Sequence, residues 1–324
     1  MVLTCTMTRN TKLLSALRRE LRISDGLVRR LKPLDVFRVN GERAHTNRPL
    51  VPGDVVSVTL EEAPPAFPAE DGPLSVLWED DCLIALDKPA GIIVHPTFSR
   101  QTGTLANYLL GWYRRTGQAC AVHVLTRLDR DTMGVVIFAK NAWAHWLLME
   151  ELDRGEIEKR YEALTLGGPA ADEGLIDLPI AKRPNPSLLR YVSPDGKPAR
   201  TRYRVLERGP ARSPEGVPIC RLELIPLTGR THQLRVHCSH LGFPILGDPQ
   251  YGGARPAGGE PAPPEPPGSA QEDAAARGSG QQLVARQISL VHPLTGERLR
   301  FVSNIALRSP TAAPENRQEA GSLP

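Results

Sequence analysis

The feature that most constrains this chain is a charged run that leads directly into an apolar one. The run LTRLDRDTMG, from Leu125 to Gly134, carries two carboxylates and two guanidiniums and is followed by the apolar residues VVIF. A glycine ahead of a β-branched run predicts a loop that delivers the chain into a buried strand. Charged side chains on such a loop lie at the mouth of a sheet, where functional sites are commonly built. A polar turn with solvated ion pairs is the other interpretation of this run.

Length and composition bound the class of protein. The chain has 324 residues, of which 40% are hydrophobic and 23% charged, as is typical of a globular protein with one large domain and a small one. No apolar run approaches the roughly 20 residues that a membrane span needs. The N-terminal stretch MVLTCTMTRNTKLL lacks the apolar core of a secretory signal. We therefore expect a cytoplasmic protein with no membrane partner.

The cysteines and histidines give no pattern that is typical of a metal site. The 5 cysteines are scattered and form no CxxC pair, which favours reduced, structural thiols over a zinc site or a disulfide framework. His232, His237 and His240 lie close together in sequence, but the first two would face different sides of a helix. We expect no metal and no cofactor.

The basic residues gather in two segments. The net charge of +4 is weak evidence for nucleic acid by itself, but arginines crowd the first fifty residues and again the stretch from Lys182 to Arg204. Phosphate contact is one interpretation of both segments, and a solvated basic face is the other.

Residues 11–60 predict a small unit of helices and short strands. Leucines at helical spacing predict helices at Leu13–Leu21 and Leu27–Leu31. Asn40-Gly41 predicts a hairpin turn, and a Pro-Gly-Asp turn precedes the alternating strand Val55–Val58.

Two basic helices followed by VNGE and PGD resemble the S4 RNA-binding domain. The resemblance implies that one set of basic side chains faces RNA phosphates, and ordinary surface charge is the alternative. This set comprises Arg18, Arg19, Arg29, Arg30 and Lys32.

A larger domain is expected after a proline-rich linker at residues 63–73. It is predicted to span residues 74–308, with a Pro- and Gly-rich disordered insertion at 253–282 and a disordered tail at 309–324. The elements expected along it are strands at 74–78, 82–86, 92–94 and from 135, helices from 104 and over 141–151, strands at 158–166, 174–208 and 220–226, a basic helix around 230–240, and closing strands from 283.

Four motifs in this domain resemble those of the RluA-type pseudouridine synthases. LTRLDRDTMG is similar to the family motif H-R-L-D-x-x-T-S-G, with Thr126 in place of the histidine and Met133 in place of the serine. The string EDDCLIALDKPAGIIVHP resembles the first family motif, EKRYEAL resembles K-x-Y-x-A, and TGRTHQLRVH is similar to the third motif almost letter for letter. Their order along the chain is that of the family.

The resemblance implies an α+β fold in which a mixed, mostly antiparallel sheet has flanking helices, beside the small N-terminal S4-like α/β domain. It implies an enzyme that isomerises uridine to pseudouridine in RNA, either ribosomal or transfer RNA. Asp129 would be the catalytic carboxylate, Arg230 its partner, and Tyr161 the ring that stacks on the target base. Other residues implied at the substrate are Arg127, Arg130, His95, Thr231, His232, Gln233, Ile245 and Leu246. From the residues alone, His95 is open between a catalytic imidazole and a packed one.

The chemistry is consistent with these roles. The conversion breaks one bond between base and ribose and makes another. It needs no redox step and no high-energy donor, and a carboxylate is a suitable covalent partner. A carboxylate in a cleft that excludes water would become protonated without a partner. A guanidinium at Arg230 would keep Asp129 ionised through charge-assisted hydrogen bonds. The target uridine must also leave its stack, at a cost of a few kcal/mol.

Two other functions remain open at this stage. Thr126 and Met133 favour a non-catalytic RNA-binding or ribosome-assembly protein on the same scaffold. A glycosidase-like hydrolase could use Asp129 and Asp131, but residues two apart on a loop have no fixed separation.

Overall fold

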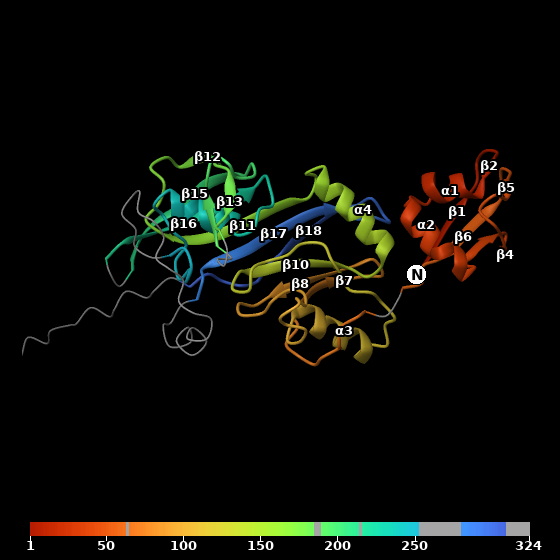
Figure 1. The fold of residues 1–324 in the computed structure, drawn as a ribbon, viewed down its shortest axis with the longest axis horizontal. Helices are drawn as coiled ribbons and strands as arrows, with labels where there is room; N and C mark the ends of the chain where they lie inside the picture. Colours follow the sequence, from red (N-terminus) through yellow and green to blue (C-terminus); the bar gives the residue numbers. More distant parts are fainter. Residues whose placement is uncertain (63–64, 185–188, 214–215, 253–279, 309–324) are drawn as a thin grey trace, which may run out of the picture. The chain divides into compact units, whose positions relative to one another are not determined.

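The computed structural model describes residues 1–62, 65–184, 189–213, 216–252 and 280–308 (Figure 1). Within these ranges the chain forms two compact units. Unit 1 contains residues 1–130, 134–158 and 287–303. Unit 2 contains the described residues among 131–133, 159–286 and 304–324.

The N-terminal part of unit 1 has its own small sheet. Its strands are β1 (Val2–Thr6), β3 (Phe37–Val39), β4 (Glu42–Arg43) and β6 (Val55–Thr59), in the order β1-β6-β3-β4, beside α1 (Leu13–Arg19), α2 (Asp25–Leu31), the 3-10 turn η1 (Lys32–Leu34) and the pair β2 (Thr11–Lys12) and β5 (Pro49–Leu50). The two predicted helices and the hairpin are confirmed, since Asn40 and Gly41 have φ angles of 53° and 83°. Strand β1 was not predicted, because it is fixed by pairing with the distant β6 rather than by a local pattern.

The rest of unit 1 is built around two strands that are buried on both faces. It contains β7 (Val76–Glu79), β8 (Leu83–Lys88), β9 (His123–Val124), β10 (Met133–Ala139), the second half of β17 (Leu283–Val291), β18 (Arg298–Val302), α3 (Leu105–Arg115) and α4 (Ala142–Asp153). Strand β10 pairs antiparallel with β8 and also borders β17. Strand β9 was not predicted; the other strands and both helices were predicted, and they are confirmed.

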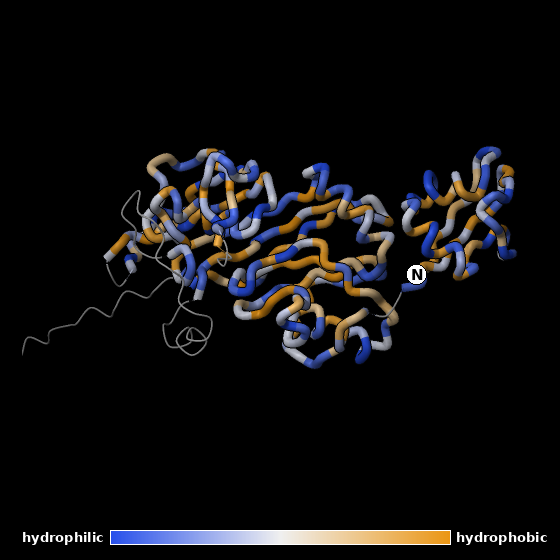
Figure 2. Tube along the Cα trace, in the orientation of Figure 1, coloured by the Kyte–Doolittle hydropathy of each residue, from blue (hydrophilic) through white to orange (hydrophobic). Residues whose placement is uncertain are grey.

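Alternate side chains of β8 and β10 pack on different helices. Ile84 and Val136 belong to a core that includes Leu109 of α3, whereas Ala85 and Ile137 belong to one that includes Leu147 of α4. Figure 1 shows α3 and α4 on opposite sides of these strands, and Figure 2 shows the strands mostly in orange. Burial on both faces explains why the run after Gly134 is continuously apolar rather than alternating.

Unit 2 has a sheet whose main apolar face packs on a helix, with a smaller apolar cluster of Leu164, Ile219 and Leu246 on the other face. Its strands are β11 (Glu158–Leu166), β12 (Glu173–Asp177), β15 (Arg200–Arg212) and β16 (Pro218–Pro226), in the order β12-β15-β16-β11, beside α5 (Gln233–His240) and the pair β13 (Ile180–Lys182) and β14 (Arg190–Val192). On the apolar face, Leu222 and Leu224 of β16 pack with Leu234 and Cys238 of α5. Strand β11 pairs antiparallel with β16, β16 with β15, and β15 with β12, in agreement with the predicted mostly antiparallel sheet.

Two local predictions were wrong. Ile92–Val94 is not a strand, because the carbonyls of Ile93 and Val94 accept the first amides of α3, from Leu105 and Ala106. The first amides of a helix have no acceptor inside the helix, and here the segment Ile92–Val94 supplies the acceptors. The basic helix begins only at Gln233, so Arg230 and His232 precede it.

Other sequence predictions have mixed outcomes. Residues 253–279 and 309–324 lie outside the described residues, so the predicted disordered insertion and tail are not described there. The predicted insertion also ran to Gln282, but Gln281 and Gln282 are buried at 2% and 4% exposure. The cysteines are free thiols, as predicted. Within the described ranges, no helix combines the length and the apolar character that crossing a bilayer requires.

We predict that Gly111→Ala lowers the thermal unfolding midpoint. An added Cβ at Gly111 would overlap the backbone carbonyl oxygen of Glu70, and overpacking of this kind costs about 1–3 kcal/mol. Gly26→Ala in α2 is the matched control, because nothing lies within 4 Å of its added Cβ. Alanine is the better helix former, so the control should keep or raise the midpoint. Equal midpoints for the two variants would contradict the prediction.

Candidate active site

Asp129 lies on the loop between β9 and β10 in unit 1. The loop leaves β9 at a backbone hydrogen bond of 2.9 Å from the Leu125 amide to the Ile137 carbonyl, and enters β10 through Gly134 at a φ of 107°. Asp129 is partly buried, whereas Arg127 and Arg130 on either side are exposed. The loop therefore presents a sheltered carboxylate between two accessible guanidiniums.

Lys88 fixes the chain next to Asp129. Its side chain is fully buried at 0% exposure. The ammonium donates hydrogen bonds to the carbonyls of Pro89 at 2.9 Å, Ile92 at 2.8 Å and Arg130 at 2.7 Å. A buried charge is tolerated when its donors are satisfied, and an ammonium has three of them. The first motif thus holds the backbone of the Asp129 loop.

His95 lies in the same unit, and the charge of Arg127 affects its pKa. Burial, and then the nearby Arg127 guanidinium, lower the pKa of His95 from its ordinary value. Its ring meets the edge of Phe67 at a centroid distance of 5.3 Å. Its Nδ1 is buried and has no hydrogen-bond partner among the described residues. His95 is therefore a neutral imidazole at physiological pH, beside the Asp129 loop.

Tyr161 lies on β11 in unit 2. It pairs in register with Leu224 of β16 and packs against the core that includes Leu234 of α5. Its neighbours Arg160 and Glu162 point to the opposite face, because side chains alternate along a strand. The tyrosine ring is partly buried, with one side supported by the core.

Arg230 and Thr231 are exposed on the turn before α5 in unit 2. The Arg230 Nε donates a hydrogen bond to the Pro198 carbonyl at 3.0 Å. Gln233 shapes this turn: its Oε1 accepts from the Arg230 amide at 3.0 Å and from the Thr228 hydroxyl at 2.7 Å. Its Nε2 donates to the Arg200 carbonyl at 2.9 Å, so the whole amide is bonded within the protein.

His232 has a left-handed backbone, with a φ of 57°, at the start of α5. Its Nδ1 lies 2.9 Å from the Tyr251 hydroxyl. Arg235, 5% exposed, makes a two-pronged ion pair with the buried Asp248, at 2.7 and 2.9 Å. The sequence did not indicate this pair, because a buried arginine in a helix has the same local pattern as an exposed one.

Ile245 and Leu246 are buried at 1% and 7% exposure. Ile245 belongs to the core against α5, and the Leu246 amide donates to the Leu164 carbonyl of β11. The resemblance implied that both form an apolar wall at the substrate. Their packing supports the positions of β11 and Tyr161, and the wall itself stays a prediction.

The sequence profile of the RNA pseudouridylate synthase family matches residues 82–240. The uncharacterized RNA pseudouridine synthase YhcT of Bacillus subtilis is 34% identical over 287 residues, covering 88% of this chain and 86% of that protein. The chain belongs to the RNA pseudouridine synthase family. Members of this family are enzymes that convert uridine to pseudouridine.

Further relatives and a solved structure agree with this assignment. The ribosomal large subunit pseudouridine synthase D of Xanthomonas campestris is 38% identical, covering 81% of this chain and 75% of that protein. The synthase D of Escherichia coli K12 is 36% identical, covering 77% and 72%. The structure of human RNA pseudouridylate synthase domain containing 1 superimposes with a TM-score of 0.54 at 26% identity, covering 73% of this chain and 85% of the human one. The predicted fold class and enzyme class are confirmed.

The N-terminal basic residues of this synthase lie on exposed helix surfaces. Arg18, Arg19, Arg29, Arg30 and Lys32 are all exposed. Two of them have acidic neighbours: Arg18 lies 2.5 Å from Asp25, and Arg30 lies 3.3 Å from Glu62. The helices therefore present accessible positive charge, as phosphate contact would need.

The second basic segment of the synthase is partly neutralised by cross-strand carboxylates. Arg200 and Arg204 of β15 stand opposite Asp177 and Glu173 of β12. Arg204 also lies 3.2 Å from Glu223 of β16. Opposite charges across a sheet stabilise it locally and reduce its net potential. For this segment the arrangement favours the solvated face over phosphate contact.

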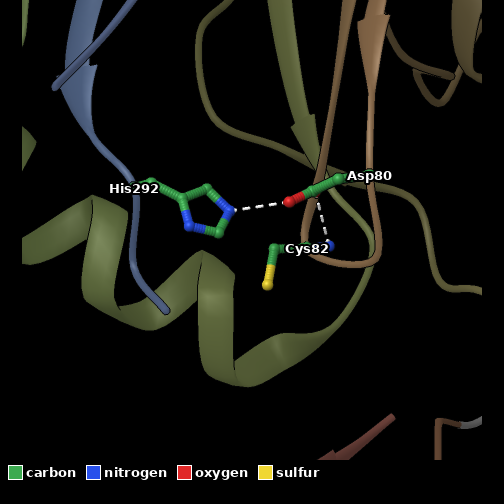
Figure 3. Close-up of side chains that lie close together, drawn as sticks. All are labelled: Asp80, Cys82 and His292. Carbon is green, nitrogen blue, oxygen red and sulfur yellow. Dashed lines mark hydrogen bonds and ion pairs between the residues drawn. The ribbon is translucent and has the colours of Figure 1, made fainter. Parts of the chain in front are cut away.

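One group of side chains in the synthase has metal-ligand chemistry. Among the described residues, Asp80, Cys82 and His292 bring potential ligand atoms within 4.8 Å of one another (Figure 3). The Thr295 amide donates to Nδ1 of His292 at 3.0 Å, so Nε2 carries the proton and lies 2.8 Å from Asp80. Burial, and then the charge of Asp80, raise the pKa of Cys82 to about 12. The three side chains therefore already have contacts within the protein, with Nδ1 of His292 accepting from the backbone and Nε2 facing Asp80.

We predict that the buried His237 makes the protein less stable below neutral pH. Its Nε2 lies 2.9 Å from the Leu178 carbonyl and its Nδ1 2.9 Å from the Thr201 hydroxyl, and burial lowers its pKa. The unfolded chain therefore binds this proton more readily, so the free energy of unfolding should fall as the pH drops below about 6.5.

Urea unfolding at several pH values measures this slope. His237→Gln should reduce the slope strongly. His240→Gln, at the exposed end of the same helix, should reduce it much less, because burial lowers the pKa of His237 more than the charge of His240 does. The slope should not vanish, since burial also lowers the pKa of His95 and His145. Identical slopes in the two variants would rule out His237 as a source of the loss of stability at low pH.

Proposed function

We propose that this synthase isomerises uridine in ribosomal RNA of the large subunit. The proposal is carried by its similarity to two proteins named for that substrate, at 38% and 36% identity over about four fifths and three quarters of the chain. The exposed arginines of α1 and α2 would add phosphate contacts outside the catalytic part, because RNA affinity depends strongly on such contacts.

Asp129 is the carboxylate we assign to the covalent step. It would attack C1′ of the ribose as the bond between C1′ and the uracil N1 breaks. C5 of the turned uracil would then bond to C1′ as the bond between C1′ and the carboxylate breaks, which frees Asp129. C5 loses its proton to solvent and N1 takes one up. Arg127 and Arg130 flank this carboxylate and are exposed, which suits contacts to the phosphates on either side of the target uridine.

Tyr161 and Arg230 are assigned to holding the base and the carboxylate. Tyr161 would support the detached uracil by stacking, since one side of its ring already rests on the core. Arg230 would pair with Asp129 and keep it ionised. His95, Thr231 and His232 are assigned to contacts with the substrate.

The domain organisation is part of this proposal. Residues 1–62 would form the S4-like RNA-binding domain, and residues 74–308 the catalytic domain, in a cytoplasmic protein. Neither a metal nor a cofactor has a step to perform in this isomerisation, in which the carboxylate supplies the covalent partner.

We predict that Asp129→Asn abolishes turnover and leaves RNA binding largely intact. An amide of similar shape keeps the loop but cannot act as the nucleophile. The measurement is tritium release from large-subunit ribosomal RNA transcribed with 5-tritiated uridine, together with filter binding of the same RNA. Asp131→Asn is the matched control, because Asp131 is also a partly buried carboxylate of this loop.

The same assay separates the alternatives. A synthase releases tritium and leaves the RNA chain intact, whereas a hydrolase cuts a glycosidic bond and a binding protein does neither. Full activity in Asp129→Asn, or equal losses in both variants, would remove Asp129 from the covalent step.

A further inference from the structure

The loop that carries Asp129 is anchored at two points after the carboxylate. The first is the hydrogen bond of 2.7 Å from the buried Lys88 ammonium to the Arg130 carbonyl. The second is at Thr132, whose hydroxyl oxygen accepts a hydrogen bond of 2.8 Å from Nε2 of Gln281. The two anchors act on different groups, one on the backbone and the other on a side chain.

The Gln281–Thr132 bond is buried. Gln281 is 2% exposed and Thr132 is 3% exposed, although they lie just before β17 and β10. A buried amide donor without a partner is unfavourable, so the two side chains hold each other in one arrangement. The bond joins residues 149 positions apart in the chain.

The position of this bond matters because of how the chain is divided. Residues up to Arg130 belong to unit 1, whereas Thr132 and Gln281 both belong to unit 2. Unit 2 also contains Tyr161 and Arg230. Gln281 therefore holds Thr132, the part of the loop just after Asp131, in place within unit 2.

We propose that Gln281 is a positioning residue, which sets the geometry of the Asp129 loop by holding Thr132 and does not itself touch the substrate. The inference rests on the proposed function of Asp129. Small misplacements of a reacting group cost rate much more than binding, because reaction needs a narrow range of geometries. Loss of Gln281 should therefore lower kcat and leave KM nearly unchanged.

Gln282 provides a matched control in the neighbouring position. It is also buried, at 4% exposure. Its Nε2 donates to the Gly280 carbonyl and its Oε1 accepts from the Arg308 amide, so it makes buried hydrogen bonds that do not involve Thr132. A general loss of packing at the start of β17 should affect the Gln281→Ala and Gln282→Ala variants alike.

The first experiment measures tritium release by the full-length protein from large-subunit ribosomal RNA transcribed with 5-tritiated uridine. Gln281→Ala should lower kcat between about tenfold and 100-fold. Thr132→Val, which removes the accepting hydroxyl, should have a similar effect. The double variant should be no slower than either single one, because both changes remove the same bond.

The second experiment needs no activity. Hydrogen–deuterium exchange of peptides that cover residues 125–134 should be faster in Gln281→Ala than in the wild type, and unchanged in Gln282→Ala. If the wild-type protein releases no tritium, the proposed function fails, and exchange still decides whether Gln281 holds the loop. Equal loop exchange in the two alanine variants, or additive losses of kcat in the double variant, would overturn the proposal.

Discussion

The structure depends on one buried ammonium. Lys88 is 0% exposed, and its ammonium donates hydrogen bonds to the backbone carbonyls of Pro89, Ile92 and Arg130. A charge so placed is stable only while those carbonyls stay in position, so it links the turn after β8 to the loop before β10. The same turn leads to the carbonyls that receive the first amides of α3. The first family motif and the motif that contains Asp129 are thus parts of one hydrogen-bonded structure.

The strands that carry the proposed catalytic groups are packed differently in the two units. In unit 1, β8 and β10 are buried on both faces, which makes the strand after Asp129 a rigid base for its loop. In unit 2 the main apolar face of the sheet packs on α5, and Tyr161 lies on that face with its ring against the core. The charged side chains of β15 lie on the other face, paired with carboxylates of β12 and β16.

Much of the fold was predictable because its signals are local. Gly134 before an apolar run, Thr104 at the start of α3 and Asn40-Gly41 in the hairpin each decide the conformation of adjacent residues. The failed prediction at Ile92–Val94 has a physical cause, since an apolar triplet has the same composition in a strand as in a segment that supplies carbonyls to Lys88 and α3. The motifs placed Asp129 in a loop and Tyr161 in a strand, as the structure has them, whereas Arg230 was expected in a helix and lies on the turn before α5.

The sequence by itself determined the family, the class of fold and the residues of the candidate site, because motifs and periodicity are properties of neighbouring residues. The fold then brings together buried polar groups that are distant in the chain: Arg235 and Asp248, Gln233 and the Arg200 carbonyl, and Gln281 and Thr132. It also decided that carboxylates stand opposite arginines of the second basic segment. These partners are far apart in the chain, and their pairing depends on strand register and helix packing, which no local pattern encodes.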